Sequence, residues 1–458
     1  MEKLVEQIVN YAERISYQDL QPHVVNRAKA LILDSIGCGL GGSMSPPGRI
    51  VQSVASEVSS LRPATVIGTG DQTSPDVAAF ANSVMIRYLD FNDTYLGGGH
   101  PSDMLAPVLA CVEAANGNGE QAILGVVLAY EVYCGVRESA EKEFTAKGYR
   151  PHGNQAAFGP MAAAAVAGKM LDLEREQMGH AISLAAVAHH PPLQGEGQLS
   201  HWKACRLANA SRVGVFSAML ASRGLTGPEL VFGGEEGFFT AIGATFNFEP
   251  HIPTEARIMR THVKAFPCGF HGMGPATSAR ELHPQLASRL DDIREVRVHA
   301  TRTSAELMAS ETRWRPETRE TADHSIPFVV SMVLMNGNLE ILHFEEERFK
   351  WPQVRDFMDK IRVLTPDSYE AEYHRVPAVL VEVELKSGEV LSAETRLPLG
   401  HPENPMNEAD FERKWRALAE PVLPAKQMDE LLDRLWHLDE AANISEILAM
   451  TAAPTHSQ

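Results

Sequence analysis

The segment DFNDTYLGGGHPSD, from Asp90 to Asp103, gathers carboxylates, an amide, a threonine and a histidine around three consecutive glycines. A phosphate loop is disfavoured, because GGGH lacks the GxxxxGK[ST] spacing and does not lead from a buried strand into a helix. A calcium loop needs alternating oxygen ligands closed by a glutamate, and this spacing does not supply them. A metal site built from Asp90, Asp93 and His100 has no HxxxH or HxxE partner nearby to support it. Acid–base chemistry and an ordinary turn are the interpretations left.

The acid–base interpretation depends on how the segment presents its histidine. Asp90 is expected at the end of a helix, and the glycines at 97–99 let the backbone approach a ligand closely. The following proline holds His100 extended, and a histidine there can titrate near neutrality. The alternative is a turn in which Ser102 or Asp103 caps the next helix. The local pattern favours the cap, and a cap does not exclude a catalytic histidine.

Other candidates share one feature, which is a polar side chain at a helix start or at a kink. They are His152 in GYRPHGNQ, Lys203 in SHWKACRLANA, Lys264 and His271 in VKAFPCGFHGMGP, and Asp323 and His324 in ETADHSIPF. His152 precedes a helix, and the N–H groups of a helix N-terminus favour a bound anion beside it. The same helix dipole disfavours the cation of Lys203, and this unfavourable position suggests a functional role for the lysine. The ordinary explanations are a loop histidine, a solvated lysine and, for Asp323, a cap. Convergence of these residues would make a polar site between packed helices.

Helical periodicity dominates the first half of the chain. In QPHVVNRAKALILDSIGCGLGG, Pro22 suits a first turn, and the glycines at 39, 41 and 42 are expected to end the helix. Further helices are predicted in SPDVAAFANSVMIRYLD, GEQAILGVVLAYEVYCGVRESA, the alanine-rich NQAAFGPMAAAAVAGKMLDL and KACRLANASRVGVFSAMLASRG.

The pattern changes after about residue 265. IREVRVHAT alternates as a strand, HSIPFVVSMVLMNG is a short apolar helix, and AVLVEVELKSGEVLSAETRLPLG is a β-hairpin with a Ser-Gly turn. Helices then return in NEADFERKWRALAE and AKQMDELLDRLWHL. We therefore predict a mainly α protein in which a helical domain, 1–264 and 398–458, carries a smaller inserted α/β domain at 265–397. A cleft between two such domains is a common place for a ligand.

Composition excludes several classes of function. The formal net charge of −18, without a Lys/Arg-rich run, argues against nucleic acid and anionic membranes as partners. The five cysteines are scattered and show no zinc or iron–sulfur spacing. The amphipathic, acidic MEKLVEQIVNYAERI is not a signal peptide, and we find no membrane span. These features predict a cytoplasmic protein.

Several of these motifs together resemble the MmgE/PrpD family: LILDSIGCGLGG, MIRYLDFNDTYLGGGHPSD, KACRLANASRVGVFSAMLASRGLTGP, KAFPCGFHG and TRETADHSIPF, in this order along nearly the whole chain. The family includes 2-methylcitrate dehydratases, cis-aconitate decarboxylases and an iminodisuccinate epimerase. The resemblance implies a helical domain with a small α/β lid, a homodimer, an anionic polycarboxylate substrate, and no metal or other cofactor.

The resemblance also implies site residues. Asp90, Thr94 and His100 match the family's D-x-x-x-T-x5-H core, which lines the active site of the decarboxylases. His152 matches a histidine before the alanine-rich helix. Two lysines match as well: Lys203 opens the next helix of the site, and Lys264 belongs to a K-x-[FY]-P motif. We expect catalytic roles for Asp90, His100, His152 and Lys203, and substrate binding by Thr94, Lys264 and His271.

Two positions depart from the family pattern. Some members have a histidine or cysteine where this chain has Gly269, and His271 is a substitute only if the alignment contains a gap. Many members end the HSLPY motif in tyrosine, where this chain has Phe328.

The implied chemistry starts with removal of a proton α to a carboxylate, which needs cations around the developing charge and an acid for the leaving hydroxyl. In that scheme His100 is the main proton-transfer group, and Asp90 sets its tautomer or acts as partner base. FNDT followed by HPSD resembles the dehydratases more, so a hydro-lyase acting on 2-methylcitrate or a similar acid is expected. The alternatives are a cis-aconitate-type decarboxylase, then an epimerase, and an inactive helical scaffold.

Overall fold

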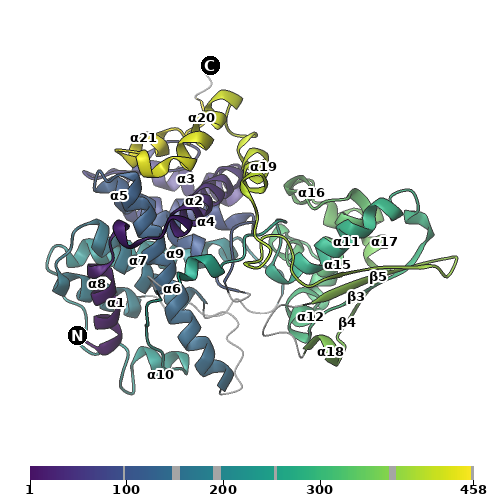
Figure 1. The fold of residues 1–458 in the computed structure, drawn as a ribbon, viewed down its shortest axis with the longest axis horizontal. Coiled ribbons are helices and arrows are strands. Elements are labelled where there is room, and N and C mark those ends of the chain that lie inside the picture. Colours follow the sequence, from purple (N-terminus) through teal and green to yellow (C-terminus); the bar gives the residue numbers. More distant parts are fainter. Residues whose placement is uncertain (96–97, 147–154, 189–196, 252–254, 371–377, 455–458) are drawn as a thin grey trace.

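The computed structural model describes residues 1–458 apart from 96–97, 147–154, 189–196, 252–254, 371–377 and 455–458. Its hydrophobic residues form two cores. The large core draws on residues 4–263 and again on 406–448, and the small core draws on residues 266–393. Figure 1 shows the corresponding arrangement, with a larger helical part beside a smaller part that contains the main sheet. The prediction of a mainly α protein with a small α/β part is confirmed.

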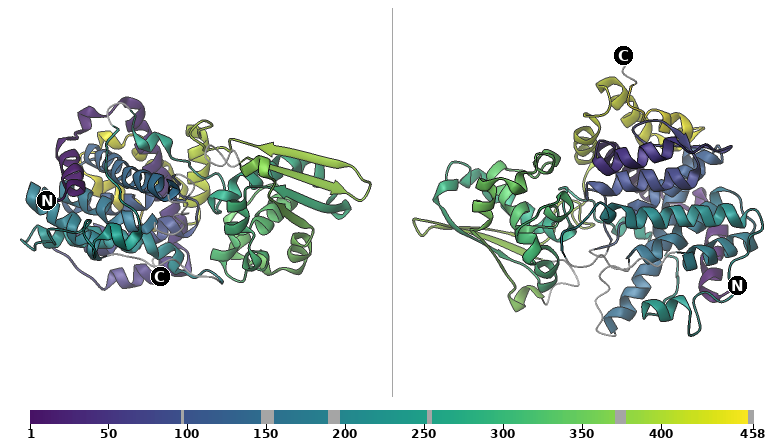
Figure 2. Two further views of the ribbon diagram at one scale, coloured as in Figure 1. Left: turned by 90° about the horizontal axis from the view of Figure 1, so that it is seen from below. Right: turned by 180° about the vertical axis from the view of Figure 1, so that it is seen from behind.

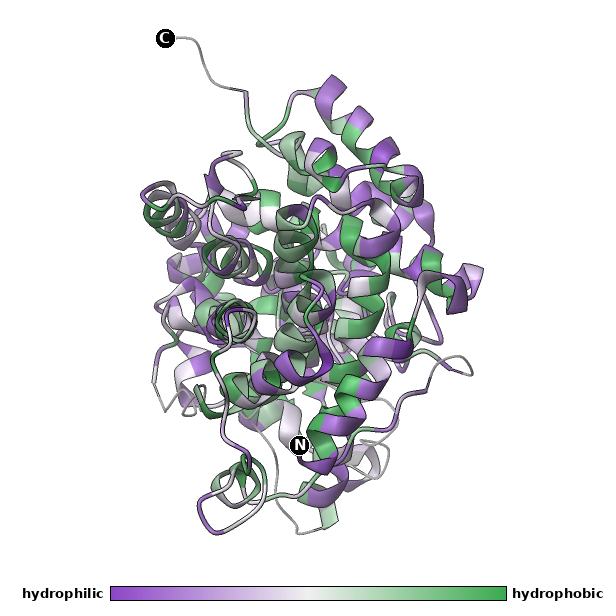
Figure 3. Ribbon diagram, turned by 90° about the vertical axis from the view of Figure 1, so that its left-hand side faces the viewer, coloured by the Kyte–Doolittle hydropathy of each residue, from purple (hydrophilic) through white to green (hydrophobic). Residues whose placement is uncertain are grey.

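Helices build almost all of the large core, and α9 packs between α4 and α7. The helices of the first part of the chain are α1 (Lys3–Arg14), α2 (Pro22–Ser43), α3 (Pro46–Ser56), α4 (Pro75–Tyr88), α5 (Leu105–Ala114), α6 (Gly119–Ala146), α7 (Gln155–Met170), α8 (Arg175–Ala188), α9 (Trp202–Ala221) and α10 (Phe238–Ile242). A two-stranded ribbon of β1 (Ala64–Thr65) and β2 (Gln72–Thr73) accompanies them. Seen from the side in Figure 3, hydrophobic residues predominate on the helices in the middle of this part and hydrophilic residues at its rim.

The glycines of α2 do not end the helix, and the prediction that they would is wrong. The helix begins at Pro22 as expected but continues through the glycines to Ser43. A Cβ on Gly42 would lie 2.0 Å from the carbonyl oxygen of Met85 in α4. Gly42 is therefore needed for close packing of α2 on α4, and this packing outweighs its low helix propensity.

The C-terminal helices return to the large core. They are α19 (Glu408–Ala419), α20 (Ala425–Trp436) and α21 (Ile444–Ala449). Both α19 and α20 pack on α2, and α21 packs on α5. Figures 1 and 2 both show these C-terminal helices against the larger helical part. Among the described residues, no helix combines the length and apolar character needed to cross a membrane.

The small core is a four-stranded sheet with helices packed on it. The strands are β3 (Ile293–His299), β4 (Ile361–Leu364), β5 (Val379–Leu385) and β6 (Val390–Thr395), in the order β4-β3-β5-β6. Only the β3–β4 pair is parallel, and β5 and β6 form the predicted hairpin. Helix α11 (Met273–Leu286) packs on β5 and β6, and α15 (Ile326–Asn336) packs on α11. The remaining helices are short: α12 (Arg302–Met308), α13 (Glu311–Trp314), α14 (Arg319–Ala322), α16 (Ile341–Glu345), α17 (Pro352–Met358) and α18 (Asp367–Glu370).

The chain crosses between the cores twice, and the two crossings are hydrogen-bonded to each other. The N–H of Val263 donates to the carbonyl of Gly400 at 3.0 Å. Gly400 has a φ of +93°, and a Cβ there would lie 1.8 Å from the Val263 oxygen, so only glycine fits. His262 is 4% exposed beside these crossings, and its ring packs edge-on to that of His401 at 5.9 Å.

Because His262 is buried, we expect the folded protein to lose stability in mild acid. Burial, together with His401 and Lys264, lowers its pKa to about 3. The unfolded chain therefore binds a proton near pH 6.5 that the folded chain does not, so stability falls as the pH drops below about 6.5. This one residue is expected to remove about 2 kcal/mol of stability between pH 7 and pH 5. The free energy of unfolding, measured with denaturant at pH 7 and at pH 5, is expected to fall less in His262→Leu than in the parent, by about this amount. An equal pH effect in the variant and the parent would contradict the assignment.

Candidate active site

The site includes Asp90, which follows the end of α4 by two residues and has a left-handed backbone conformation. Asp90 is fully buried and has a φ of +51°, which is unusual for a residue with a side chain. The helix ends two residues earlier, and Arg319 of α14 donates to the carbonyls of Tyr88 and Leu89 at 2.9 and 3.2 Å. The small core therefore holds the end of α4, and the chain turns the Asp90 carboxylate inward.

Three basic side chains surround that carboxylate. Arg87 donates to Oδ1 of Asp90 at 2.6 Å, Lys264 also bonds Oδ1, and the Nζ of Lys203 lies 3.0 Å from Oδ2. Lys264 donates in addition to the Asp90 carbonyl at 3.0 Å. Burial by itself would raise the pKa of Asp90, but the cations outweigh it and hold that pKa well below its usual range. Asp90 is thus a charged anchor for the three cations.

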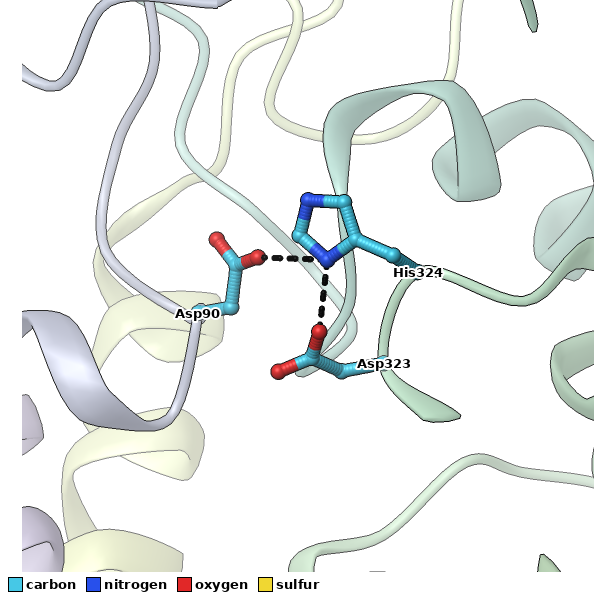
Figure 4. A group of neighbouring side chains, drawn as sticks. All are labelled: Asp90, Asp323 and His324. Atoms are coloured by element: carbon cyan, nitrogen blue, oxygen red, sulfur yellow. Dashed lines mark hydrogen bonds and ion pairs between the residues drawn. The ribbon is translucent and has the colours of Figure 1, made fainter. Parts of the chain in front are cut away.

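The small core supplies a second carboxylate to the same cluster. Lys203 donates to both oxygens of Asp323, at 2.6 and 2.7 Å, and so bridges the Asp90 and Asp323 carboxylates. His324 places Nδ1 2.6 Å from Asp323 and 3.4 Å from Asp90, as Figure 4 shows. Burial opposes the charge of Asp323, yet Lys203 and His324 lower its pKa. Because a charged carboxylate only accepts, Nδ1 of His324 carries the hydrogen and Nε2 has the lone pair.

His100 occupies the wall on the large core. Its Nδ1 lies 2.8 Å from the carbonyl oxygen of Asp93, and a carbonyl only accepts, so Nδ1 carries the hydrogen. The Asp93 carbonyl therefore fixes the tautomer, so the expectation that Asp90 would do so is wrong, whereas the alternative role of Asp90 as partner base stays a prediction. Burial, Arg87 and Lys264 lower the pKa of His100 well below its usual value. His100 is neutral, with the lone pair on Nε2.

The predicted helix caps are not formed, because the polar groups concerned bond elsewhere. Asn92 donates to Ser102 Oγ and to Asp103 Oδ1, both at 2.9 Å, and neither side chain caps α5. Asp103 is buried 3.8 Å from Arg87, and burial raises its pKa well above the usual value. Ser325 caps α15 in place of Asp323.

A cavity of about 240 Å³ opens beside this cluster, between residues of the two cores. Its lining includes five basic side chains, three histidines and one carboxylate: Arg87, Lys203, Arg206, Lys264 and Arg313; His100, His271 and His324; and Asp90. Most of these side chains are buried, where charge acts more strongly than in water. A protein with a net charge of −18 therefore concentrates positive charge around one cavity.

Of the residues predicted from sequence, Asp90, His100, Lys203, Lys264 and His271 line the cavity. Nδ1 of His271 lies 2.9 Å from the hydroxyl of Ser304. Thr94 is buried next to His262, with which it exchanges backbone hydrogen bonds at 2.8 and 2.9 Å, and it is not among the lining residues. His152 lies outside the described residues. The substrate-binding role of Thr94 and the catalytic role of His152 stay predictions.

Sequence reasoning missed Arg87, Arg206 and Arg313 and left Asp323 and His324 out of the site. Arg87 carried a usable signal, because it precedes Asp90 by three residues at the end of a predicted helix. The sequence singles out the adjacent Asp323 and His324, but a helix cap explains Asp323 equally well. Arg313 lies in a four-residue helix, and the sequence offers no signal for its position.

The two departures from the family pattern have different structural meanings. A Cβ on Gly269 would lie 3.2 Å from Cδ2 and Nε2 of His324, so the missing side chain leaves space for that ring. Phe328 is fully buried in the small core, with its ring 5.4 Å from Phe344 and 5.9 Å from Phe349. Phe328 is not among the residues that line the cavity.

Asp90, Asp323 and His324 offer three ligand atoms within 4.8 Å of one another, a spacing suited to a metal ion. The oxygens, however, already face Arg87, Lys203 and Lys264, and a divalent cation would have to displace these charges. We expect turnover to be unchanged after dialysis against EDTA. Loss of activity that added metal restores would contradict this expectation.

The arrangement defines a mainly helical enzyme in which histidines, carboxylates and basic side chains surround one cavity. Residues 6–251 match the MmgE/PrpD N-terminal domain and residues 266–438 match the MmgE/PrpD C-terminal domain, so the chain belongs to the MmgE/PrpD family.

Its relatives include two kinds of lyase. Cis-aconitate decarboxylase of Homo sapiens is 25% identical over 99% of this chain and 96% of its own length. 2-Methylcitrate dehydratase of Salmonella typhi is 27% identical over 86% of this chain and 85% of its own length. The mitochondrial 2-methylcitrate dehydratase of Yarrowia lipolytica is 26% identical over 87% and 80%.

Proposed function

We propose that this protein is a metal-independent hydro-lyase that dehydrates 2-methylcitrate or a similar hydroxy-polycarboxylate. The observation that carries the proposal is the cavity, which has basic side chains from both cores and two neutral histidines in its lining. Preorganised cations bind the carboxylates and stabilise the enediolate-like charge that forms when the α-proton leaves. The names of the dehydratase relatives agree with this substrate class.

Dehydration needs a group that takes a proton and a group that gives one, and the cavity has a histidine for each. His100 is in the form that accepts a proton at Nε2. His324 is backed by Asp323, whose charge stabilises the imidazolium that forms when Nε2 is protonated. A bound polycarboxylate adds negative charge and favours this protonated form. His100 then takes the α-proton, and His324 protonates the leaving hydroxyl. Lys203 and Lys264 meet the developing charge.

The remaining parts of the proposal follow from the family. One part is the division into a helical domain (1–264 and 398–458) and a lid domain (265–397), a proposal that the two separate hydrophobic cores support. We also propose a homodimer in the cytoplasm.

A decarboxylase acting on cis-aconitate is the second candidate. The human decarboxylase aligns with 99% of this chain, against 86–87% for the dehydratases named above. The same cations would stabilise the carbanion left by loss of CO2. Decarboxylation requires protonation of that carbanion but no proton abstraction from carbon, so the paired histidines favour dehydration.

One panel of substrates separates these functions. The purified full-length chain is incubated in D2O with 2-methylcitrate, citrate, cis-aconitate or iminodisuccinate, and proton NMR follows each reaction. An unsaturated product from 2-methylcitrate or citrate supports the proposal. Release of CO2 from cis-aconitate replaces it with decarboxylation, and deuterium uptake alone replaces it with epimerisation. No change in any sample would indicate an inactive scaffold.

A further inference from the structure

Arg313 stands on a backbone that is fixed from several sides. It lies in α13, where its own N–H donates to the carbonyl of Ser310 at 2.8 Å. Its carbonyl accepts from the hydroxyl of Ser325 at 2.6 Å, and the Trp314 indole donates to the Ala309 carbonyl at 2.9 Å. The position of Arg313 is therefore set before any ligand binds, and its side chain lines the cavity from the small core.

The guanidinium of Arg313 differs from the cations on the opposite wall. Its Nε and Nη1 are buried, and neither has a hydrogen-bond partner in the part of the chain that the structure describes. Arg87, Lys203 and Lys264, in contrast, each face a carboxylate of the protein within 3.0 Å. Burying these two nitrogens without partners is costly, because their lost hydration is not replaced. Burial accordingly lowers the pKa of Arg313, and Asp323 only partly offsets this.

We propose that Arg313, whose side chain lines the cavity, binds one carboxylate of the substrate through its guanidinium group. A planar carboxylate matches the fork of a guanidinium, and such charge-assisted pairs are among the strongest hydrogen bonds in proteins. The inference rests on the proposed function for the substrate class and adds the residue that selects it. Arg313 is a substrate-binding residue rather than a proton donor, because arginine stays protonated throughout.

The position of Arg313 also defines the substrate more narrowly. Lys203 and Lys264 lie at the Asp90 cluster, whereas Arg313 approaches from the small core. A substrate that meets both has at least two carboxylates, one for the lysines and one for Arg313. Its binding then links the two cores through the ligand, which adds to the contacts at the crossings and at Arg319.

The test measures binding rather than turnover, so it does not depend on the reaction. The probe is tricarballylate, a tricarboxylate without the hydroxyl group that dehydration would remove. Isothermal titration calorimetry compares the parent with Arg313→Gln and Arg313→Lys. The matched control is Arg315→Gln, since Arg315 belongs to the same segment but is exposed and paired with Asp359 at 2.5 Å.

Arg313→Gln is expected to weaken tricarballylate binding about 10- to 100-fold, Arg313→Lys less, and Arg315→Gln not measurably. Without ligand, the thermal midpoint of Arg313→Gln is expected to equal or exceed that of the parent, because the variant no longer buries two guanidinium nitrogens without hydrogen-bond partners. A structural role would instead lower this midpoint. Undiminished binding by Arg313→Gln, or an equal loss in Arg315→Gln, would overturn the inference alone. A parent that binds no tricarballylate would overturn the polycarboxylate proposal with it.

Discussion

His100→Gln is expected to lower kcat about 10²- to 10⁴-fold, the range typical for loss of a positioned general base. Glutamine retains a donor that reaches toward the Asp93 carbonyl, now 2.8 Å from the His100 Nδ1. It cannot accept and release a proton. KM should change less than kcat, because cations rather than His100 bind the carboxylates. Steady-state kinetics on the substrate identified by the NMR panel measure both values.

A second histidine provides the control for His100. His343 is 4% exposed in the small core, where its Nδ1 accepts from the N–H of Glu340, and it is not among the residues that line the cavity. His343→Gln removes a buried imidazole away from the chemistry and is expected to leave kcat unchanged. Full turnover by His100→Gln, or an equal loss in both variants, would remove His100 from the mechanism.

Asp90→Asn is expected to reduce both stability and turnover, because it leaves three cations around a neutral side chain. Removing one partner of a buried ion pair typically costs about 3–5 kcal/mol. The pKa of Asp90 is depressed in the folded chain, so its contribution is present at neutral pH and is lost as the pH falls below the ordinary carboxyl pKa, toward the lowered folded value. Denaturant unfolding at neutral pH measures the loss, and activity assays on the folded fraction measure turnover.

Two further variants show whether the lost charge causes the expected destabilisation of Asp90→Asn. Asp359→Asn breaks an exposed pair with Arg315 and is expected to change stability by no more than about 0.5 kcal/mol. Adding Lys264→Met to Asp90→Asn removes one uncompensated cation and should recover part of the lost stability. If Asp90→Asn were as stable and as active as the parent, Asp90 would not be the anchor of the cluster.

Local sequence patterns determined the helices, the hairpin at β5–β6 and the identity of several reactive groups. Periodicity predicts such elements because it reflects one buried face, and motif spacing placed Asp90, His100 and Lys203 beside element ends. Composition likewise set the expectation that any anion site must gather its own cations. These properties depend on neighbours within a few residues, so the sequence expresses them directly.

Tertiary structure decided which of these groups meet. Lys203 reaches Asp323 across 120 positions of the chain, and Lys264 reaches Asp90 across 174. Packing also explains why α2 continues past its glycines, because the backbone of Met85 approaches too closely for any side chain at Gly42. The orientation of Arg313 toward the cavity has the same origin. Contacts of this kind arise only when segments far apart in the chain pack together, and no local periodicity records that arrangement.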